Sequence, residues 1–263
     1  MSKKVKYASN FLSHAPPGEY EVCVNDLKQI APESTVIQAR NETKVQWHEN
    51  NYFFVVVQDH TAIICADARQ PDGSYLDPHS GYLFNFDFDS KKVTTTSNKG
   101  PSQSPICTEL IPALDAYAAS SYKDKSFAGC YTLPDGSISI VLRSSSTSLS
   151  NCRTGAVYAR YVLQKNGTFT GTIKSIEHFF ENGNALSEFG SDLNTKIKMG
   201  DAKSVSKAVL RAIDDFEQNW LDAANTAFEK VGSEALFKLR RKFPVTHTKI
   251  QWERELTPGS FIA

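Results

Sequence analysis

The stretch AKSVSKAVLRAIDDFEQNWLDAANTAFEKV, residues 202–231, predicts one long amphipathic helix. Its apolar residues recur three or four positions apart, which is the spacing of a single buried stripe. The stripe comprises Val205, Ala208, Val209, Ala212, Ile213, Phe216, Trp220, Ala224, Ala227, Phe228 and Val231. The acidic and amide residues between them are predicted to face water: Asp214, Asp215, Glu217, Gln218, Asp222 and Glu229. Such a helix would be about 45 Å long, so it needs an extended apolar surface to cover.

Five strand-like segments before this helix can supply that surface. They cover residues 127–133, 138–142, 157–163, 169–180 and 185–189. Three of the four pairs of consecutive segments are separated by strong hairpin signals, which are Asp135-Gly136, Asn166-Gly167 and Asn182-Gly183. A Ser/Thr-rich loop is expected from the end of the second segment to Thr154. The sequence therefore predicts an α+β fold, in which one long helix covers an antiparallel meander of about five strands. Its open edge strands favour pairing with a partner chain.

The chain divides into four predicted regions. These are a helical region over 1–49, a β region over 50–105, a helix–sheet–helix region over 106–242 that ends in a short basic helix, and a basic segment with the C-terminal tail over 243–263. Val22, Val24, Leu27 and Ile30 are the predicted apolar side of the second N-terminal helix, and Val36, Ile37, Ala39, Val45 and Trp47 that of the third. Residues 91–105 are expected to form a surface connection, and 106–122 a helix.

Composition places limits on the partners of the chain. Its 263 residues carry 29 basic and 29 acidic side chains, so no whole-molecule attraction to nucleic acid or membrane is expected. The N-terminus lacks the apolar run of a signal peptide, and no stretch approaches the length of a membrane span. The five cysteines are far apart and predict free thiols. We therefore expect a soluble cytoplasmic protein.

Catalytic and metal-binding motifs are missing from the sequence. It contains no nucleophile elbow, phosphate loop, dinucleotide fingerprint or zinc-protease motif. The histidines His14, His48, His60, His79 and His178 lack acidic or nucleophilic partners at a known spacing, so they are expected to be structural or exposed rather than catalytic. Glu177, His178 and Glu181 resemble a metal cluster only weakly, because neighbours on a strand point to opposite faces. We expect no catalytic residue, cofactor or metal, and no enzymatic activity.

The basic segment from Lys238 to Lys249 is the strongest indication of a partner. It carries five positive charges and His247 but no acid. A solvated charge cluster and a binding surface are equally compatible with such a run. Nucleic acid is the less favoured partner, because the chain as a whole carries no net charge.

Two signatures make the chain resemble the F-actin capping protein alpha subunits, the CapZ alpha family. One is Phe11-Leu-Ser-His-Ala-Pro-Pro-Gly-Glu followed by Val24-Asn-Asp, and the other is Leu239-Arg-Arg-Lys-Phe-Pro-Val-Thr-His-Thr-Lys-Ile-Gln-Trp. Tyr75-Leu-Asp-Pro and His178-Phe-Phe-Glu-Asn-Gly-Asn are weaker matches. The resemblance implies an N-terminal helical stalk, a sheet that joins the sheet of a partner subunit, and a mobile C-terminal tentacle.

The resemblance further implies that the chain blocks subunit exchange at the barbed ends of actin filaments, as the alpha subunit of a dimer in the cytoplasm and cytoskeleton. The residues that would bind actin are Lys238, Arg240, Arg241, Lys242, His247, Lys249, Trp252 and Leu256. The partner would be a capping protein beta subunit or a second copy of this chain. Family regulators that the sequence leaves open are CARMIL-type peptides, myotrophin and phosphoinositides.

The chain departs from the family pattern at several positions. His247 stands where the family has arginine, and Phe237 where it has lysine. Ser150-Asn-Cys-Arg-Thr-Gly replaces a Trp-Asn-Gly-x-Trp motif, and the tail after Trp252 is short and contains Pro258 and Gly259. These departures predict capping that depends on the basic segment more than on the tail. The alternatives are a homodimeric cap, a dynactin-type subunit on an actin-related filament, and, more remotely, a phosphoinositide-binding scaffold.

Overall fold

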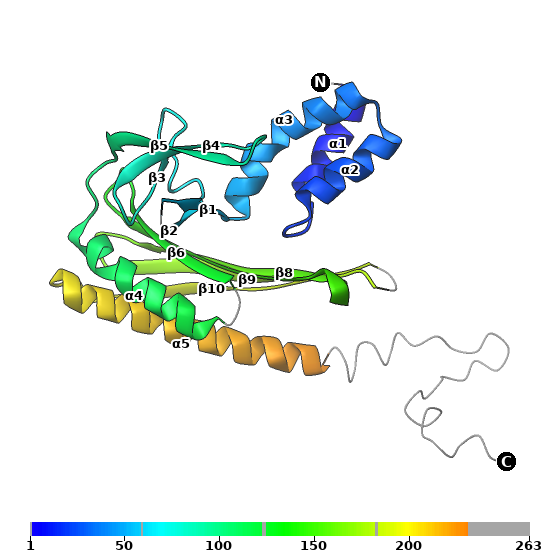
Figure 1. Ribbon diagram of the computed structural model, residues 1–263. Helices are drawn as coiled ribbons and strands as arrows, with labels where there is room; N and C mark the ends of the chain where they lie inside the picture. Colours follow the sequence, from blue (N-terminus) through cyan, green and yellow to red (C-terminus); the bar gives the residue numbers. More distant parts are fainter. Residues whose placement is uncertain (1, 59, 123–124, 182–183, 231–263) are drawn as a thin grey trace, which may run out of the picture. The chain divides into compact units, whose positions relative to one another are not determined.

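The computed structural model describes residues 2–58, 60–122, 125–181 and 184–230. Its largest element is a five-stranded antiparallel sheet in which each strand pairs with its neighbour in sequence, in the order β10-β9-β8-β7-β6 (Figure 1). The strands are β6 (Lys125–Thr132), β7 (Ile138–Ser148), β8 (Arg153–Leu163), β9 (Thr168–Phe179) and β10 (Ala185–Lys196). Gly136 and Gly167 have φ of 78° and 82°, which explains the glycine at both hairpin turns. The predicted α+β fold and meander are confirmed.

The Ser/Thr-rich loop predicted up to Thr154 is wrong. Residues 144–148 continue β7, and they pair in unbroken register with 153–157 at the start of β8. A short 3-10 helix, Leu149–Asn151, separates the two strands. Serine has a weak strand preference, but pairing along a preformed hairpin decides the conformation here. β10 likewise extends seven residues beyond the predicted Phe189, to Lys196.

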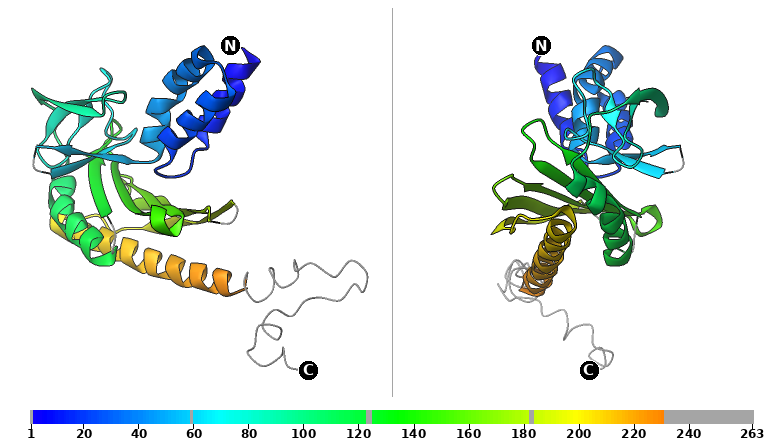
Figure 2. Two further views of the ribbon diagram at one scale, coloured as in Figure 1. Left: turned by 45° about the vertical axis from the view of Figure 1, so that its right-hand side comes forward. Right: turned by 90° about the vertical axis from the view of Figure 1, so that its left-hand side faces the viewer.

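The long helix is α5 (Ala202–Lys230), which confirms the prediction except for Val231, outside the described residues. The chain divides into two units after Phe216. In the first, residues 202–216 cover the sheet on the same side as α4 (Pro105–Ser121), as Figure 2 shows. Val205, Val209 and Ile213 are fully buried. The ring of Phe216 meets that of Tyr161 edge-on at 6.1 Å.

In the second part of α5, the burial of two residues differs from the prediction. Glu217 is only 6% exposed, although it was assigned to the water-facing side. It stands four residues after Ile213 and three before Trp220, so helical geometry places it on the stripe. Phe228 was assigned to the stripe and is 53% exposed, since burial ends at Ala224.

Two small sheets stand on the opposite face of the meander. One pairs β1 (Phe53–Val57) with β2 (His60–Ile64), and the other has the order β3 (Tyr75–Leu76), β4 (Tyr82–Asp87), β5 (Lys92–Lys99). Their core joins Tyr131 and Val141 of the meander. The predicted surface connection over 91–105 is wrong for β5, because Val93 and the following threonines pair with β4.

Three helices form the N-terminal region: α1 (Lys3–Ser13), α2 (Tyr20–Ile30) and α3 (Glu33–Asn50). Tyr20 packs α2 against α3, because its ring lies 4.9 Å from that of Trp47. The predicted apolar side of α2 is partly wrong, since Val22 and Ile30 are 55% and 82% exposed. Positions three, four and seven after Tyr20 share its face, and these are Cys23, Val24 and Leu27, all buried. Ile37 of α3, also predicted to be inside, is 53% exposed.

Candidate functional site

All the residues predicted to bind actin lie outside the described residues. They are Lys238, Arg240, Arg241, Lys242, His247, Lys249, Trp252 and Leu256, within 231–263. What the structure does describe is α5, the element that leads to them and ends at Lys230. Their role in binding actin therefore stays a prediction.

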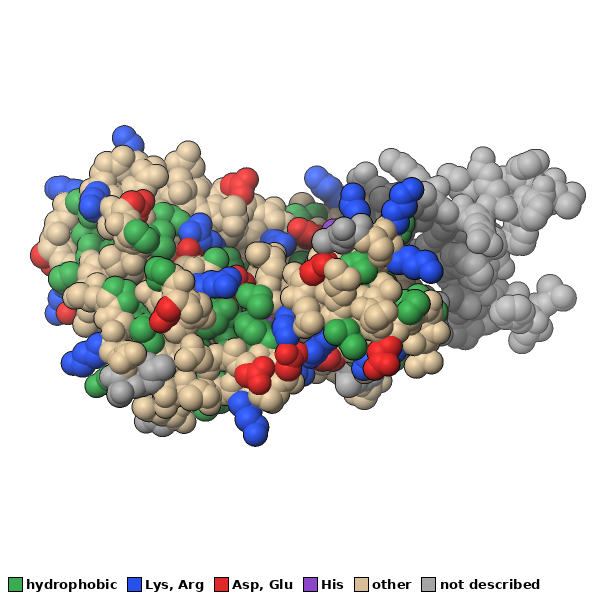
Figure 3. Space-filling model, turned by 90° about the horizontal axis from the view of Figure 1, so that it is seen from above, with side chains coloured by type: hydrophobic (Ala, Val, Ile, Leu, Met, Phe, Trp, Pro, Cys, Tyr) green, Lys and Arg blue, Asp and Glu red, His purple; other side chains and the backbone are tan. Residues whose placement is uncertain are grey.

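The described surface seen in Figure 3 carries basic and acidic side chains across the whole face. This mixture agrees with the 29 basic and 29 acidic residues of the chain. Such a face has no strong potential of one sign, so it is a poor match for a highly acidic partner. The basic segment remains the better candidate for charge-driven binding.

Strand β10 is an open sheet edge. It pairs with β9 along its whole length, and no strand within 2–230 pairs with its other edge. Most of its side chains are exposed on both faces, and Leu186 is 61% exposed. The opposite edge, β6, is instead packed against α4 and contacts β2. An exposed edge of twelve residues is a template for pairing with another chain.

A buried polar cluster joins the start of α2 to the sheet. The imidazole of His178 on β9 donates from Nδ1 to Glu19 Oε1 at 2.7 Å, and Nε2 lies 2.6 Å from Asn184 Oδ1. Thr154 on β8 donates to the same Glu19 oxygen. Burial would lower the pKa of His178, but its hydrogen bonds to Glu19 and Asn184 outweigh burial and raise the pKa. The cluster therefore connects the residue before α2 with β8 and β9.

A second polar cluster surrounds Asp77, whose side chain is fully buried. His60 Nε2 and the Ser80 hydroxyl donate to its carboxylate, and the backbone N–H of His79 donates to Oδ1 at 3.1 Å. Burial would raise the pKa of Asp77, but hydrogen bonds from His79, Ser80 and His60 hold it well below its usual value. This cluster was not predicted, because it joins distant positions: His60 is 17 positions from Asp77, and His79 also contacts Asp115 on α4, 36 positions away.

The stability of the chain should depend on His79 at alkaline pH. Its Nε2 lies 3.0 Å from Asp115 Oδ2, and hydrogen bonds with Asp115 and then Asp77 raise its pKa from 6.5 to about 9. The folded state therefore keeps the proton longer than the unfolded state. The stabilisation is fully present below pH 6.5 and is lost as the pH rises through about 9. Because Asp115 is half-exposed, we expect a contribution of about 1–2 kcal/mol.

Urea denaturation between pH 6 and pH 10 measures this effect as the difference between the wild type and His79→Gln. The difference in the free energy of unfolding between the wild type and His79→Gln should shrink as the pH rises. The corresponding difference for the matched surface variant His14→Gln should stay constant. A constant difference for His79→Gln over this range would contradict the assignment.

The described part of the chain contains no metal-binding cluster, membrane-spanning helix or disulfide bond. Within it, no three His, Cys, Asp or Glu side chains are grouped to hold a metal ion, and no helix is long and apolar enough to cross a membrane. The five cysteines are free thiols, four of them buried, as predicted.

The sequence matches the model of the F-actin capping protein alpha subunit family over residues 8–258. The F-actin-capping protein subunit alpha of Yarrowia lipolytica is 29% identical over 251 residues, which cover 95% of this chain and 91% of that protein. The Dictyostelium discoideum protein of the same name is 22% identical, with 95% and 93% covered.

The fold is also similar to a solved structure, that of a homodimeric actin capping protein alpha subunit from Plasmodium berghei. The TM-score is 0.73 at 22% identity, and the match covers 94% of this chain and 99% of the other. The helical N-terminus, the five-stranded meander and the long helix thus occur together in both. With the family match over 8–258, we conclude that the chain belongs to the F-actin capping protein alpha subunit family.

Proposed function

We propose that the chain binds the barbed ends of actin filaments and blocks subunit exchange there, as the alpha subunit of a dimeric capping protein. The observation that carries this proposal is the family match over residues 8–258, which includes the whole basic signature from Leu239 to Trp252. Basic side chains speed encounter with the acidic filament and pair with its carboxylates. This is a binding activity of a non-enzymatic family, and it implies a cytoskeletal location.

Elongation of actin from preformed filament seeds tests the proposal. The chain is added alone, and then with a capping protein beta chain, at concentrations near that of the filament ends. Growth that stops at barbed ends, while pointed-end growth continues, supports capping. Growth that is unchanged by both the chain alone and the pair would refute it.

We further propose that the dimer forms through strand β10. The support is its open edge and its exposed faces, because a partner strand would satisfy the backbone groups along the edge. The solved Plasmodium berghei structure is that of a homodimeric alpha subunit, so a second copy of this chain is one candidate partner and a beta subunit is the other. Light scattering of the chain alone and of the co-expressed pair distinguishes them.

Leu186→Lys should weaken this dimer by about tenfold or more, because a lysine on an edge strand opposes pairing. The folded chain should be no less stable, since Leu186 is already 61% exposed. Val56→Lys on β1 is the matched control, because Val56 is 67% exposed on a strand outside the meander. Sedimentation equilibrium gives both dissociation constants. Equal constants for the two variants would place the interface elsewhere.

A further inference from the structure

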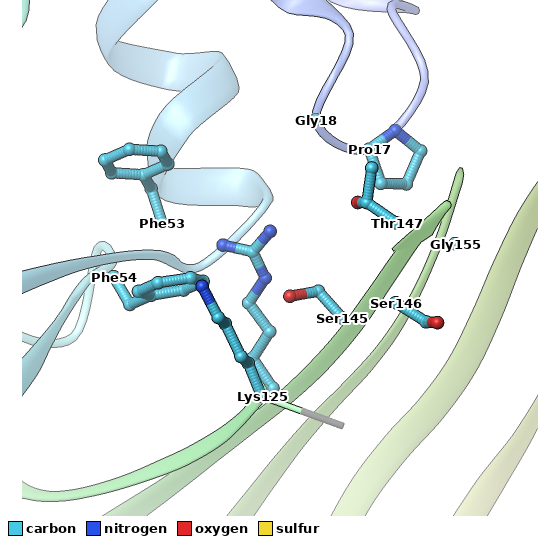
Figure 4. Close-up of a pocket in the computed structure, with 10 residues that line it drawn as sticks. Pro17, Gly18, Phe53, Phe54, Lys125, Ser145, Ser146, Thr147 and Gly155 are labelled. Atoms are coloured by element: carbon cyan, nitrogen blue, oxygen red, sulfur yellow. The ribbon is translucent and has the colours of Figure 1, made fainter. Parts of the chain in front are cut away.

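A cavity of about 390 Å³ lies over one face of the meander, between β1, the turn before α2 and the adjoining parts of β6 and β7 (Figure 4). Ten residues line it: Pro17, Gly18, Phe53, Phe54, Lys125, Arg143, Ser145, Ser146, Thr147 and Gly155. The set contains two cations, three hydroxyl groups and no carboxylate. Its size falls within the range typical of small-molecule sites.

Arg143 is the residue that sets the chemistry of this cavity. It is only 7% exposed, yet its Nε atom is buried without a hydrogen-bond partner. Its Nη1 atom donates to the Tyr52 carbonyl at 3.1 Å. The guanidinium carbon lies 5.0 Å from the centre of the Phe54 ring and 5.9 Å from that of Tyr158. Nε is covered by neighbouring atoms, so Nη2, which has no hydrogen-bond partner among the described residues, is the nitrogen left for a ligand. A guanidinium N–H forms strong, charge-assisted hydrogen bonds with oxyanions.

Among the described residues, no acid pairs with Arg143. Burial lowers its pKa, and only the hydroxyl of Tyr158 acts in the opposite direction. Glu19 is the carboxylate next to the lining residue Gly18, but it already accepts hydrogen bonds from His178 and Thr154. A buried cation without a counter-charge is costly, so a bound anion would stabilise the folded chain.

The other donors face Arg143 because of the strand register. Arg143, Ser145 and Thr147 alternate along β7 and therefore lie on one face, and Lys125 of β6 is paired with Ser145 across the ladder. In Figure 4 the hydroxyls of Ser145 and Thr147 lie on the cavity side, and the Lys125 side chain extends toward Phe54. Ser146 points away, and its hydroxyl accepts from Arg153.

We propose that this cavity is a binding site for the phosphate group of a small molecule. Nη2 of Arg143 donates to the phosphate, Lys125 adds a second positive charge, and Ser145 and Thr147 donate to the remaining oxygens. A tetrahedral dianion suits this set, since it offers more acceptor oxygens than a carboxylate and matches two cations in charge. The rest of the cavity, with the rings of Phe53 and Phe54, leaves room for the molecule that carries the phosphate.

Equilibrium dialysis of the full chain with labelled inorganic phosphate, at constant ionic strength, tests the proposal. We expect saturable binding of one phosphate per chain. Arg143→Met should weaken it by about tenfold or more, the usual effect of losing a charged hydrogen-bond donor. Lys125→Gln and Ser145→Ala change the site without changing its buried arginine, and they should weaken binding by smaller factors. Lys92→Gln, an exposed lysine on β5, is the matched control and should bind as the wild type does.

Three outcomes would overturn the proposal. The first is no saturable binding to the folded wild type. The second is binding that Lys125→Gln and Ser145→Ala leave unchanged, a result that remains informative if Arg143→Met fails to fold. The third is binding to the separated chain that disappears in the assembled dimer, which would assign Arg143 to a carboxylate of the partner chain.

Discussion

Replacement of Arg241 and Lys249 by glutamate should abolish barbed-end capping, with the dissociation constant raised by about 100-fold or more. Each substitution removes a positive charge and places a negative one against an acidic filament end, and like charges across an interface cost several kcal/mol. His247 cannot replace the lost charge, because an ordinary histidine is mostly neutral at cytoplasmic pH. Seeded elongation at several concentrations of the assembled dimer measures the change.

Lys203→Glu with Lys207→Glu is the control for this variant. Both lysines are exposed on α5, and the pair changes the net charge by the same amount. It should leave capping within about threefold of the wild type, since neither lysine belongs to the basic segment from Lys238 to Lys249 and exposed charges outside an interface are screened by salt. Truncation after Trp252 is the contrasting variant, and it should change dissociation from the filament only modestly. If the truncation removed capping and the charge reversal did not, the tail would be the main binding element.

Gly167→Ala should destabilise the chain by about 3 kcal/mol, combining the cost of positive φ with that of overpacking. Gly167 has φ of 82°, and a Cβ there would lie 2.3 Å from the Ile197 carbonyl oxygen, which is backbone. The same turn accepts a hydrogen bond from Ile197 N at 2.8 Å. The substitution would therefore separate the β8–β9 turn from the chain that leaves β10 toward α5.

Gly73→Ala isolates the conformational part of this effect. Gly73 has φ of 87°, but nothing lies within 4 Å of an added Cβ. Gly73→Ala should lower the free energy of unfolding by only about 1 kcal/mol. Urea denaturation gives the free energy of unfolding of both variants. Equal losses would mean that the contact with Ile197 yields easily, and that strain at positive φ explains the whole effect.

Local patterns were enough to predict the main elements of the fold. The Asn-Gly and Asp-Gly turns and the stripe of α5 identified the meander and its covering helix, since both depend on residues close in sequence. Ser144 to Ser148 and Lys92 to Lys99 were missed because their strand conformation depends on pairing with a neighbour. Glu217 was predicted to face water because its side chain is acidic, but its position on the helix places it on the buried stripe.

The predicted actin-binding residues came from the family resemblance, and they lie beyond Lys230, where the described chain ends. The cavity around Arg143 was not predicted at all. One signal was present, because Arg143, Ser145 and Thr147 alternate along a strand with the period of one face. Their enclosure could not be predicted, since Tyr52, which binds the guanidinium, is 91 positions away.

The sequential strand order has a consequence for synthesis on the ribosome. Every strand of the meander pairs with the one just made, so each hairpin can close soon after it emerges. The contact of Glu19 with His178 instead joins residues 159 positions apart. Helices α1 to α3 are thus made first, but the polar cluster that attaches Glu19 to the sheet is complete only when β9 has been translated, which at 5–20 residues per second takes about 8–30 s. During that interval a chaperone would meet preformed N-terminal helices before it meets a sheet.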